Sequence, residues 1–172
     1  HVRSRRQRQM CIRDSDGTAL VSVREDGQRF TLSHAELATQ VAGLQRAFRA
    51  AGIGVGDRVA ACMPNTWQTV VAMLAATSLG AVWSSSSPEF GTQGIVERFG
   101  QIEPKLLLVC AGYQYAGKAL SQVDKINEVL AALPDLELSA AFGPQHGLRG
   151  DKQDNMVAVS YTHLTLPTTP YV

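Results

Sequence analysis

Two stretches of the sequence place polar or charged side chains directly after apolar, strand-like runs. The serine run 84–87 lies between the apolar stretch that ends at Trp83 and a helix-like stretch that begins at Thr92. Backbone amides and hydroxyls in such a loop can hold anions, and an ordinary polar loop that caps the next helix explains the run equally well. Lys118 follows the apolar run 106–110 and could meet a phosphate as a point charge. A solvated lysine in the first turn of a helix is the simpler interpretation.

Other chemical motifs are either absent or lie in the wrong context. Gly52, Gly54 and Gly56 have the spacing of a dinucleotide fingerprint, but they follow a helix and precede a strand, which is the reverse of the order a phosphate cradle needs. A tight turn between helix and strand accounts for them. The sequence has no G-x-S-x-G elbow, no P-loop and no zinc-binding spacing. It therefore favours neither a serine hydrolase nor a zinc enzyme.

Composition indicates a soluble globular protein. The hydrophobic fraction is 45% and the charged fraction is 18%. No apolar run approaches the roughly 18 to 20 residues that a transmembrane helix needs, so we expect no membrane association. Cys62 and Cys110 each follow a strand-like run and are expected to be buried small apolar residues. The third cysteine, Cys11, lies in the N-terminal stretch 1–15. The two that remain form neither a disulfide framework nor a metal cluster, which makes the cytoplasm the default location.

The two ends of the sequence are related through their possible codons. Residues 10–14 can be encoded by ATG TGT ATA AGA GAC, and residues 159–163 by GTC TCT TAT ACA CAT, which is the reverse complement. Both strings resemble the translated transposon adapter used to prepare sequencing libraries. We therefore expect 1–15 and 159–172 to be non-native segments. The body between them carries 11 basic and 14 acidic side chains, a net charge of −3, with no basic patch that would indicate nucleic-acid binding.

Apolar periodicity within the body predicts strands that alternate with helices. Ser33 and Glu36 form a capping box at the start of the first helix, and Gly52 ends it. In the second helix, Val70, Met73, Leu74 and Thr77 are expected to share one face. The predicted elements are a β-hairpin over 18–32, strands over 58–63, 81–84, 106–110 and 136–142, and helices over 34–51, 66–79, 92–101 and 120–133.

This alternation predicts an α/β fold with layers: a largely parallel β-sheet, flanking helices and an N-terminal β-hairpin. The residues after Phe142 are rich in Gly, Pro and Asp and show no periodicity, so we expect a loop there.

Several motifs carry a more specific resemblance. The segment Ser87-Pro-Glu-Phe-Gly91, followed by Arg98-Phe-Gly-Gln-Ile-Glu-Pro-Lys105, resembles the acetoacetyl-CoA synthetases, a branch of the adenylate-forming acyl-CoA synthetases. Further matching stretches occur in the same order, and together they cover about 20–138. Trp83-Ser-Ser is also discriminating, because acetyl- and propionyl-CoA synthetases have a His in place of Trp83. The resemblance implies that 16–158 is part of the N-terminal AMP-dependent synthetase/ligase domain.

The resemblance also implies an activity and a set of cofactors. The intact enzyme would use ATP and Mg to convert acetoacetate to acetoacetyl-AMP, and CoA would then form the thioester. The Ser/Thr/Gly-rich phosphate loop, the ribose-binding Asp and the catalytic Lys would all follow residue 158, so we expect no catalytic residue in this chain and no ligase activity from it alone. The implied partner is a small-molecule acid, acetoacetate or another short acyl acid, and no metal ligand is assigned.

Three residues are candidate CoA contacts by resemblance. Glu89 and Phe90 match the loop that runs along CoA in the acetyl relatives. Lys118 lies near the position of an Arg that meets CoA phosphates there, while a second Arg three residues earlier is Tyr115 here. The alternatives are another short-chain acyl-CoA synthetase of the acetyl or propionyl type and a non-catalytic α/β binding module.

Overall fold

The computed structural model describes residues 16–24 and 27–142. The expected non-native ends and the loop expected after Phe142 lie outside these ranges. The described chain forms four helices and eight strands: β1 (Thr18–Val23), β2 (Arg29–Ser33), α2 (His34–Ala50), β3 (Arg58–Cys62), α3 (Trp67–Ser78), β4 (Val82–Ser86), α4 (Thr92–Ile102), β5 (Leu106–Cys110), β6 (Gly112–Tyr115), β7 (Lys118–Ser121), α5 (Val123–Ala131) and β8 (Leu138–Phe142).

A four-stranded parallel sheet forms the centre of the fold, in the order β4-β3-β5-β8. Cys62 pairs with Ser86 on one side and Val109 on the other, and Cys110 pairs with Phe142. The carboxyl ends of all four strands therefore meet at one edge. β1 and β2 form a separate antiparallel hairpin. The expected α/β fold with a parallel sheet, flanking helices and an N-terminal hairpin is confirmed.

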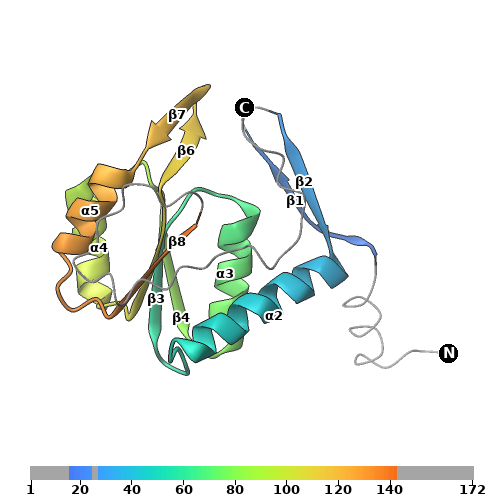
Figure 1. Ribbon diagram of the computed structural model, residues 1–172, viewed down its shortest axis with the longest axis horizontal. Coiled ribbons are helices and arrows are strands. Elements are labelled where there is room, and N and C mark those ends of the chain that lie inside the picture. Colours follow the sequence, from blue (N-terminus) through green and yellow to red (C-terminus); the bar gives the residue numbers. More distant parts are fainter. Residues whose placement is uncertain (1–15, 25–26, 143–172) are drawn as a thin grey trace.

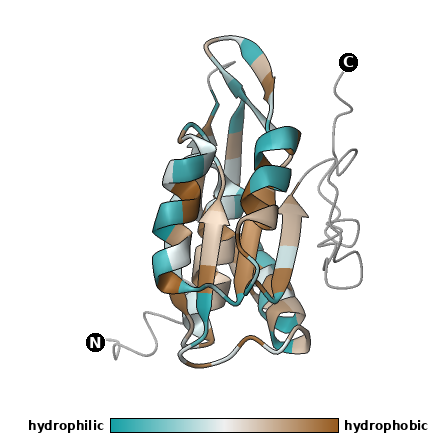
Figure 2. Ribbon diagram, turned by 90° about the vertical axis from the view of Figure 1, so that its left-hand side faces the viewer, coloured by the Kyte–Doolittle hydropathy of each residue, from teal (hydrophilic) through white to brown (hydrophobic). Residues whose placement is uncertain are grey.

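Helices cover both faces of this sheet. Successive strand residues point to opposite sides, so β3, β5 and β8 contribute apolar side chains to a core on either face. In β5, Leu106 and Leu108 belong to the core beneath α2 and α3, whereas Leu107 and Val109 belong to the core beneath α4 and α5. Figure 1 shows the two helix pairs on opposite sides of the strands. Figure 2 views the side with α4 and α5, where the strands behind the helices are mostly hydrophobic. The near-continuous apolar sequence of β5 reflects this two-sided burial.

The start and end of α2 agree with the signals in the sequence. The Ser33 amide donates to Glu36 Oε2 at 2.8 Å, and the Glu36 amide donates to Ser33 Oγ at 3.2 Å, which completes the capping box. The chain then turns at Gly52, whose φ of +78° is the left-handed conformation that glycine adopts easily. Leu44 and Phe48 lie buried in the core.

Two details of the structure go beyond the sequence pattern. The buried face of α3 consists of Val71, Ala72, Ala75 and Ala76, whereas Thr77, on the face that the pattern singled out, is exposed. Small residues on the buried face let α3 pack closely against α2 and the sheet. The larger apolar side chains lie beside this face, so their spacing did not indicate which face is buried. The strand expected over 81–84 runs instead over Val82–Ser86. Three of the four serines are therefore strand residues, and only Ser87 belongs to the following loop.

The segment after β5 also differs from the expectation of one long helix over 120–133. It forms an antiparallel hairpin, β6 with β7, followed by the shorter helix α5. Ala116 and Gly117 have φ values of 51° and 72°, so the two-residue turn between the strands has positive φ at both positions. That conformation matches the right-handed twist of a tight hairpin. Lys118 is consequently the first residue of a strand and lies outside any helix.

Within the described ranges, no helix combines the length and the apolar character needed to cross a membrane.

Candidate functional site at the carboxyl edge of the sheet

Loops that follow parallel strands line the ligand crevice of open α/β sheets. Here the carboxyl edge carries the residues after β3, the corner 87–91 after β4 and the hairpin β6–β7 after β5. The corner and the hairpin contain all three candidate CoA contacts, Glu89, Phe90 and Lys118. The structure therefore brings them to one edge of the sheet, although they come from different loops.

The corner 87–91 is a hydrogen-bonded turn. The Phe90 amide donates to the Ser87 carbonyl at 3.3 Å, and the Glu89 amide donates to Ser87 Oγ at 3.3 Å. A serine hydroxyl that accepts from a nearby amide is a common turn device. Pro88 is fully buried and restricts the backbone further. The turn therefore has a defined conformation without any ligand.

This turn presents Glu89 and Phe90 outward. Glu89 is exposed, and Phe90 is 46% exposed, which is a large fraction for an aromatic side chain. The guanidinium carbon of Arg98 lies 5.1 Å from the Phe90 ring centroid, within the range of a cation–π contact. An exposed aromatic ring beside a cation and a carboxylate can contact a ligand that has both apolar and polar groups.

Helix α5 contacts the corner region at two points. Lys125 Nζ donates to the Pro88 carbonyl oxygen at 2.7 Å, and this bond is partly buried. Thr92 Oγ1, at the start of α4, donates to Glu128 Oε2 at 2.8 Å. Sequence reasoning missed Lys125 and Glu128. Their spacing of three residues on one helix face was a signal, but their partners are 37 and 36 positions away in the chain and could not be read from a local pattern.

The two described cysteines lie beneath this edge and are both free and buried, as expected. Burial raises the pKa of the Cys62 thiol to about 11 and that of the Cys110 thiol to about 12. The positive charge of Lys125 acts in the opposite direction and lowers both pKa values. Thiols with such pKa values are poor nucleophiles at neutral pH, so both cysteines are packing residues.

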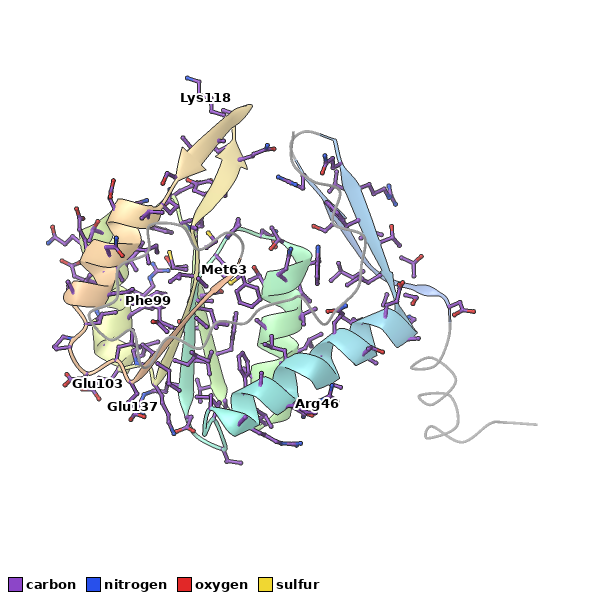
Figure 3. The ribbon with its side chains drawn as sticks, viewed as in Figure 1. Arg46, Met63, Phe99, Glu103, Lys118 and Glu137 are labelled. Carbon is purple, nitrogen blue, oxygen red and sulfur yellow. The ribbon has the colours of Figure 1, made fainter. Side chains whose placement is uncertain are left out.

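The hairpin β6–β7 follows β5 at the same edge of the sheet. Burial is the main cause that raises the pKa of the Tyr113 phenol, and the negative charge of Glu89 raises it further. Lys118 is exposed next to the turn, and Figure 3 shows it at the tip of the hairpin, projecting away from the sheet. Glu89 and Phe90 thus lie together in one turn, while Lys118 occupies the outer end of a neighbouring hairpin.

The opposite edge of the sheet holds a polar depression of about 310 Å³. Figure 3 shows Glu103 and Glu137 together at that end of the molecule. Its walls contain an ion pair between Lys105 and Asp57 at 3.2 Å and another between Arg58 and Glu103 at 3.8 Å. These pairs join neighbouring strands and loops, so we assign this edge a structural role. In the described part of the chain, no group of three or more His, Cys, Asp or Glu side chains could hold a metal ion.

The fold and the corner define the class of protein as an α/β protein with a parallel sheet and an exposed, hydrogen-bonded turn at its carboxyl edge. A family model described as AMP-binding enzyme matches residues 8–162. The chain therefore belongs to the AMP-binding enzyme family.

Individual relatives are more specific. The chain is 51% identical over 117 residues to the acetoacetyl-coenzyme A synthetase of Rhizobium meliloti, which covers 68% of this chain and 18% of that protein. It is 45% identical over 126 residues to the acetoacetyl-CoA synthetase of Xenopus tropicalis, which covers 73% of this chain and 19% of that protein. The resemblance that rested on the corner sequence is confirmed.

A solved structure supports the same relationship. The acetoacetyl-CoA synthetase from Streptomyces lividans superposes with a TM-score of 0.73 and 37% sequence identity, over 82% of this chain and 21% of that one. This chain therefore spans about a fifth of the length of the relatives that it matches.

Proposed function

We propose that this chain is part of a ligase that joins acetoacetate to CoA at the expense of ATP. The observation that carries the proposal is its 51% identity to a protein named acetoacetyl-coenzyme A synthetase. The discriminating sequence Ser87–Gly91 forms a preformed, outward-facing turn at the carboxyl edge of the sheet. Open α/β sheets bind ligands at this edge, which adds support.

The proposed reaction has two steps. A carboxylate oxygen of acetoacetate attacks the α-phosphorus of ATP, the bond to the bridging oxygen breaks, and pyrophosphate leaves. The CoA thiolate then attacks the acyl carbon of acetoacetyl-AMP, and AMP departs as the thioester forms. Mg²⁺ would offset the negative charge of the phosphates. No ligand for Mg²⁺ is assigned within 16–24 and 27–142.

We propose that the described residues act mainly in the second step, by contacting CoA. The Phe90 ring offers an apolar surface to the ligand. Glu89 is a carboxylate that repels phosphates and accepts hydrogen bonds, so its contact would be with an amide or hydroxyl donor of the pantetheine arm. Lys118 is an exposed cation that can pair with a CoA phosphate as a point charge.

The groups that adenylate acetoacetate are not among the described residues. We propose that the phosphate loop, the ribose-binding Asp and the catalytic Lys belong to other parts of the ligase, so that the 172-residue chain forms no acyl-CoA alone. The location of the ligase would be cytoplasmic.

The experiment is an end-product assay on the full-length enzyme that carries this segment. With acetoacetate, ATP, Mg²⁺ and CoA, the enzyme should release AMP and pyrophosphate in equal amounts and form acetoacetyl-CoA. Release of ADP and phosphate would contradict adenylation. The isolated chain is the matched control, and acyl-CoA formation by it would show that the catalytic groups lie within these 172 residues.

A further inference from the structure

Lys125 occupies a position that its own helix does not favour. It is the third residue of α5, in the first turn, where the helix dipole disfavours a positive charge. Asp124, its neighbour in that turn, has the sign that a helix start prefers. The energetics of the helix alone therefore does not explain a lysine at this position. The explanation must lie in the interactions of Lys125 with residues outside the helix.

The interaction that holds Lys125 is a hydrogen bond to the corner. Its Nζ donates to the Pro88 carbonyl at 2.7 Å in a partly buried position. Hydrogen bonds from a charged donor are shorter and stronger than neutral ones. Pro88 itself is fully buried, so the bond fixes the backbone directly before the two exposed residues Glu89 and Phe90.

A second bond from the same helix face holds the far end of the corner. Glu128 lies three residues after Lys125 and accepts from Thr92 Oγ1 at 2.8 Å. One bond thus precedes Glu89 and Phe90 and the other follows them. Since Arg98 also covers one side of the Phe90 ring, the turn is held at both ends and at its tip.

We propose that Lys125 is a positioning residue for CoA: it fixes the corner 87–91 so that Glu89 and Phe90 meet the pantetheine arm. This inference rests on the proposed function. Lys125 would touch no reacting atom. Losing its ammonium would leave the bonds within the turn in place but hold Glu89 and Phe90 less firmly, and the cost of ordering them on CoA would weaken CoA binding.

The expected effect is confined to one substrate. Adenylation of acetoacetate does not use the corner, so ATP–pyrophosphate exchange without CoA should be unchanged. The KM for CoA should rise, because the cost of ordering the corner falls on CoA binding alone. A general loss of stability would instead lower exchange and thioester formation together.

The test uses Lys125→Met in the full-length enzyme, which keeps most of the side-chain volume and removes the donor. We expect the KM for CoA to rise about tenfold, as loss of one charge-assisted hydrogen bond allows, while exchange stays within about twofold. Lys125→Arg should restore most of the affinity because it keeps a charged donor. Asp124→Asn is the matched control, since it changes the charge of an exposed side chain in the same turn and leaves both bonds from α5 in place, and it should leave the KM for CoA unchanged.

Thr92→Val provides an independent variant if Lys125→Met fails to fold. It removes the other bond and should raise the KM for CoA in the same direction. An unchanged KM in a folded Lys125→Met enzyme, or an equal loss of exchange and thioester formation, would overturn the positioning role and leave the ligase assignment intact. A wild-type enzyme that shows no acetoacetate-dependent exchange would overturn the proposed function and this inference together.

Discussion

The ammonium of Lys105 lies 3.2 Å from Asp57 Oδ2 and joins the chain before β5 to the loop before β3. The same ammonium donates to the Gly52 carbonyl at 2.9 Å, and the Gly54 amide donates to Asp57 Oδ2 at 2.8 Å. The Gly54 hydrogen bond is the largest cause that lowers the pKa of Asp57 below its ordinary value of 3.8, and Lys105 adds to it. These bonds hold the amino edge of the sheet, opposite the candidate site.

Replacing Asp57 by Asn should therefore lower the stability of the chain by about 1 kcal/mol at pH 7, because a partly exposed ion pair is lost and the amide bond weakens. A carboxyl with a lowered folded-state pKa stabilises the fold above its ordinary pKa and loses this effect as the pH falls through the lowered value. The difference in thermal midpoint between wild type and Asp57→Asn should thus shrink below pH 3.8. Asp135→Asn, at the same edge, is the control. A difference that stays constant from pH 7 to acid would contradict the account.

Cys62 and Cys110 should resist alkylation while the chain is folded. Their pKa values of about 11 and about 12 leave on the order of one thiolate in a thousand or fewer at pH 8, and both side chains are buried. Iodoacetamide labelling at pH 8, read at each cysteine by mass spectrometry, should be slow in buffer and fast in denaturing urea. Equal rates in both conditions would show that these thiols are accessible.

Two phenylalanines, Phe99 in α4 and Phe90 in the corner, should differ sharply in their contribution to stability. Phe99 is fully buried between α4 and the sheet, whereas Phe90 is 46% exposed. Phe99→Ala should cost about 3–5 kcal/mol through the cavity it leaves, while Phe90→Ala should cost less than about 1 kcal/mol. Urea denaturation of both variants measures this difference. Similar losses would mean that Phe90 is part of the core. It would then be unavailable to a ligand, which would contradict the role proposed for the corner and for Lys125.

The turn between β6 and β7 offers a stabilising substitution. Ala116 has a φ of 51°, a conformation that residues with a Cβ rarely adopt and that Asn tolerates better. Ala116→Asn should raise stability by about 0.5–1 kcal/mol. Ala119→Asn, in the extended strand β7, should be neutral or destabilising. A lower thermal midpoint for Ala116→Asn would contradict the turn conformation.

Most of the fold followed from the sequence because its signals are local. The capping box of Ser33 and Glu36 and the apolar run 106–110 each depend on residues close together in the chain. The hairpin β6–β7 was missed because its turn contains Ala116 and Gly117 instead of the Asn-Gly pair that marks such turns. The buried face of α3 was missed because alanines form it.

The candidate site was only partly predictable. The corner sequence Ser87–Gly91 pointed to Glu89 and Phe90 through family resemblance, and the structure places both on an exposed turn. The bonds that fix the turn come from Lys125 and Glu128. Contacts between residues 36 and 37 positions apart depend on how α4 packs against α5, which no local pattern encodes.

The most direct test of the proposed ligase is its choice of acid. The full-length enzyme that carries this segment should be assayed for CoA thioester formation with acetoacetate and with acetate, at matched ATP and CoA. We expect a kcat/KM for acetoacetate at least about tenfold higher than for acetate, within the range that pocket contacts can supply. An enzyme that prefers acetate, or that forms no thioester with either acid, would show that the chain is not part of an acetoacetate–CoA ligase.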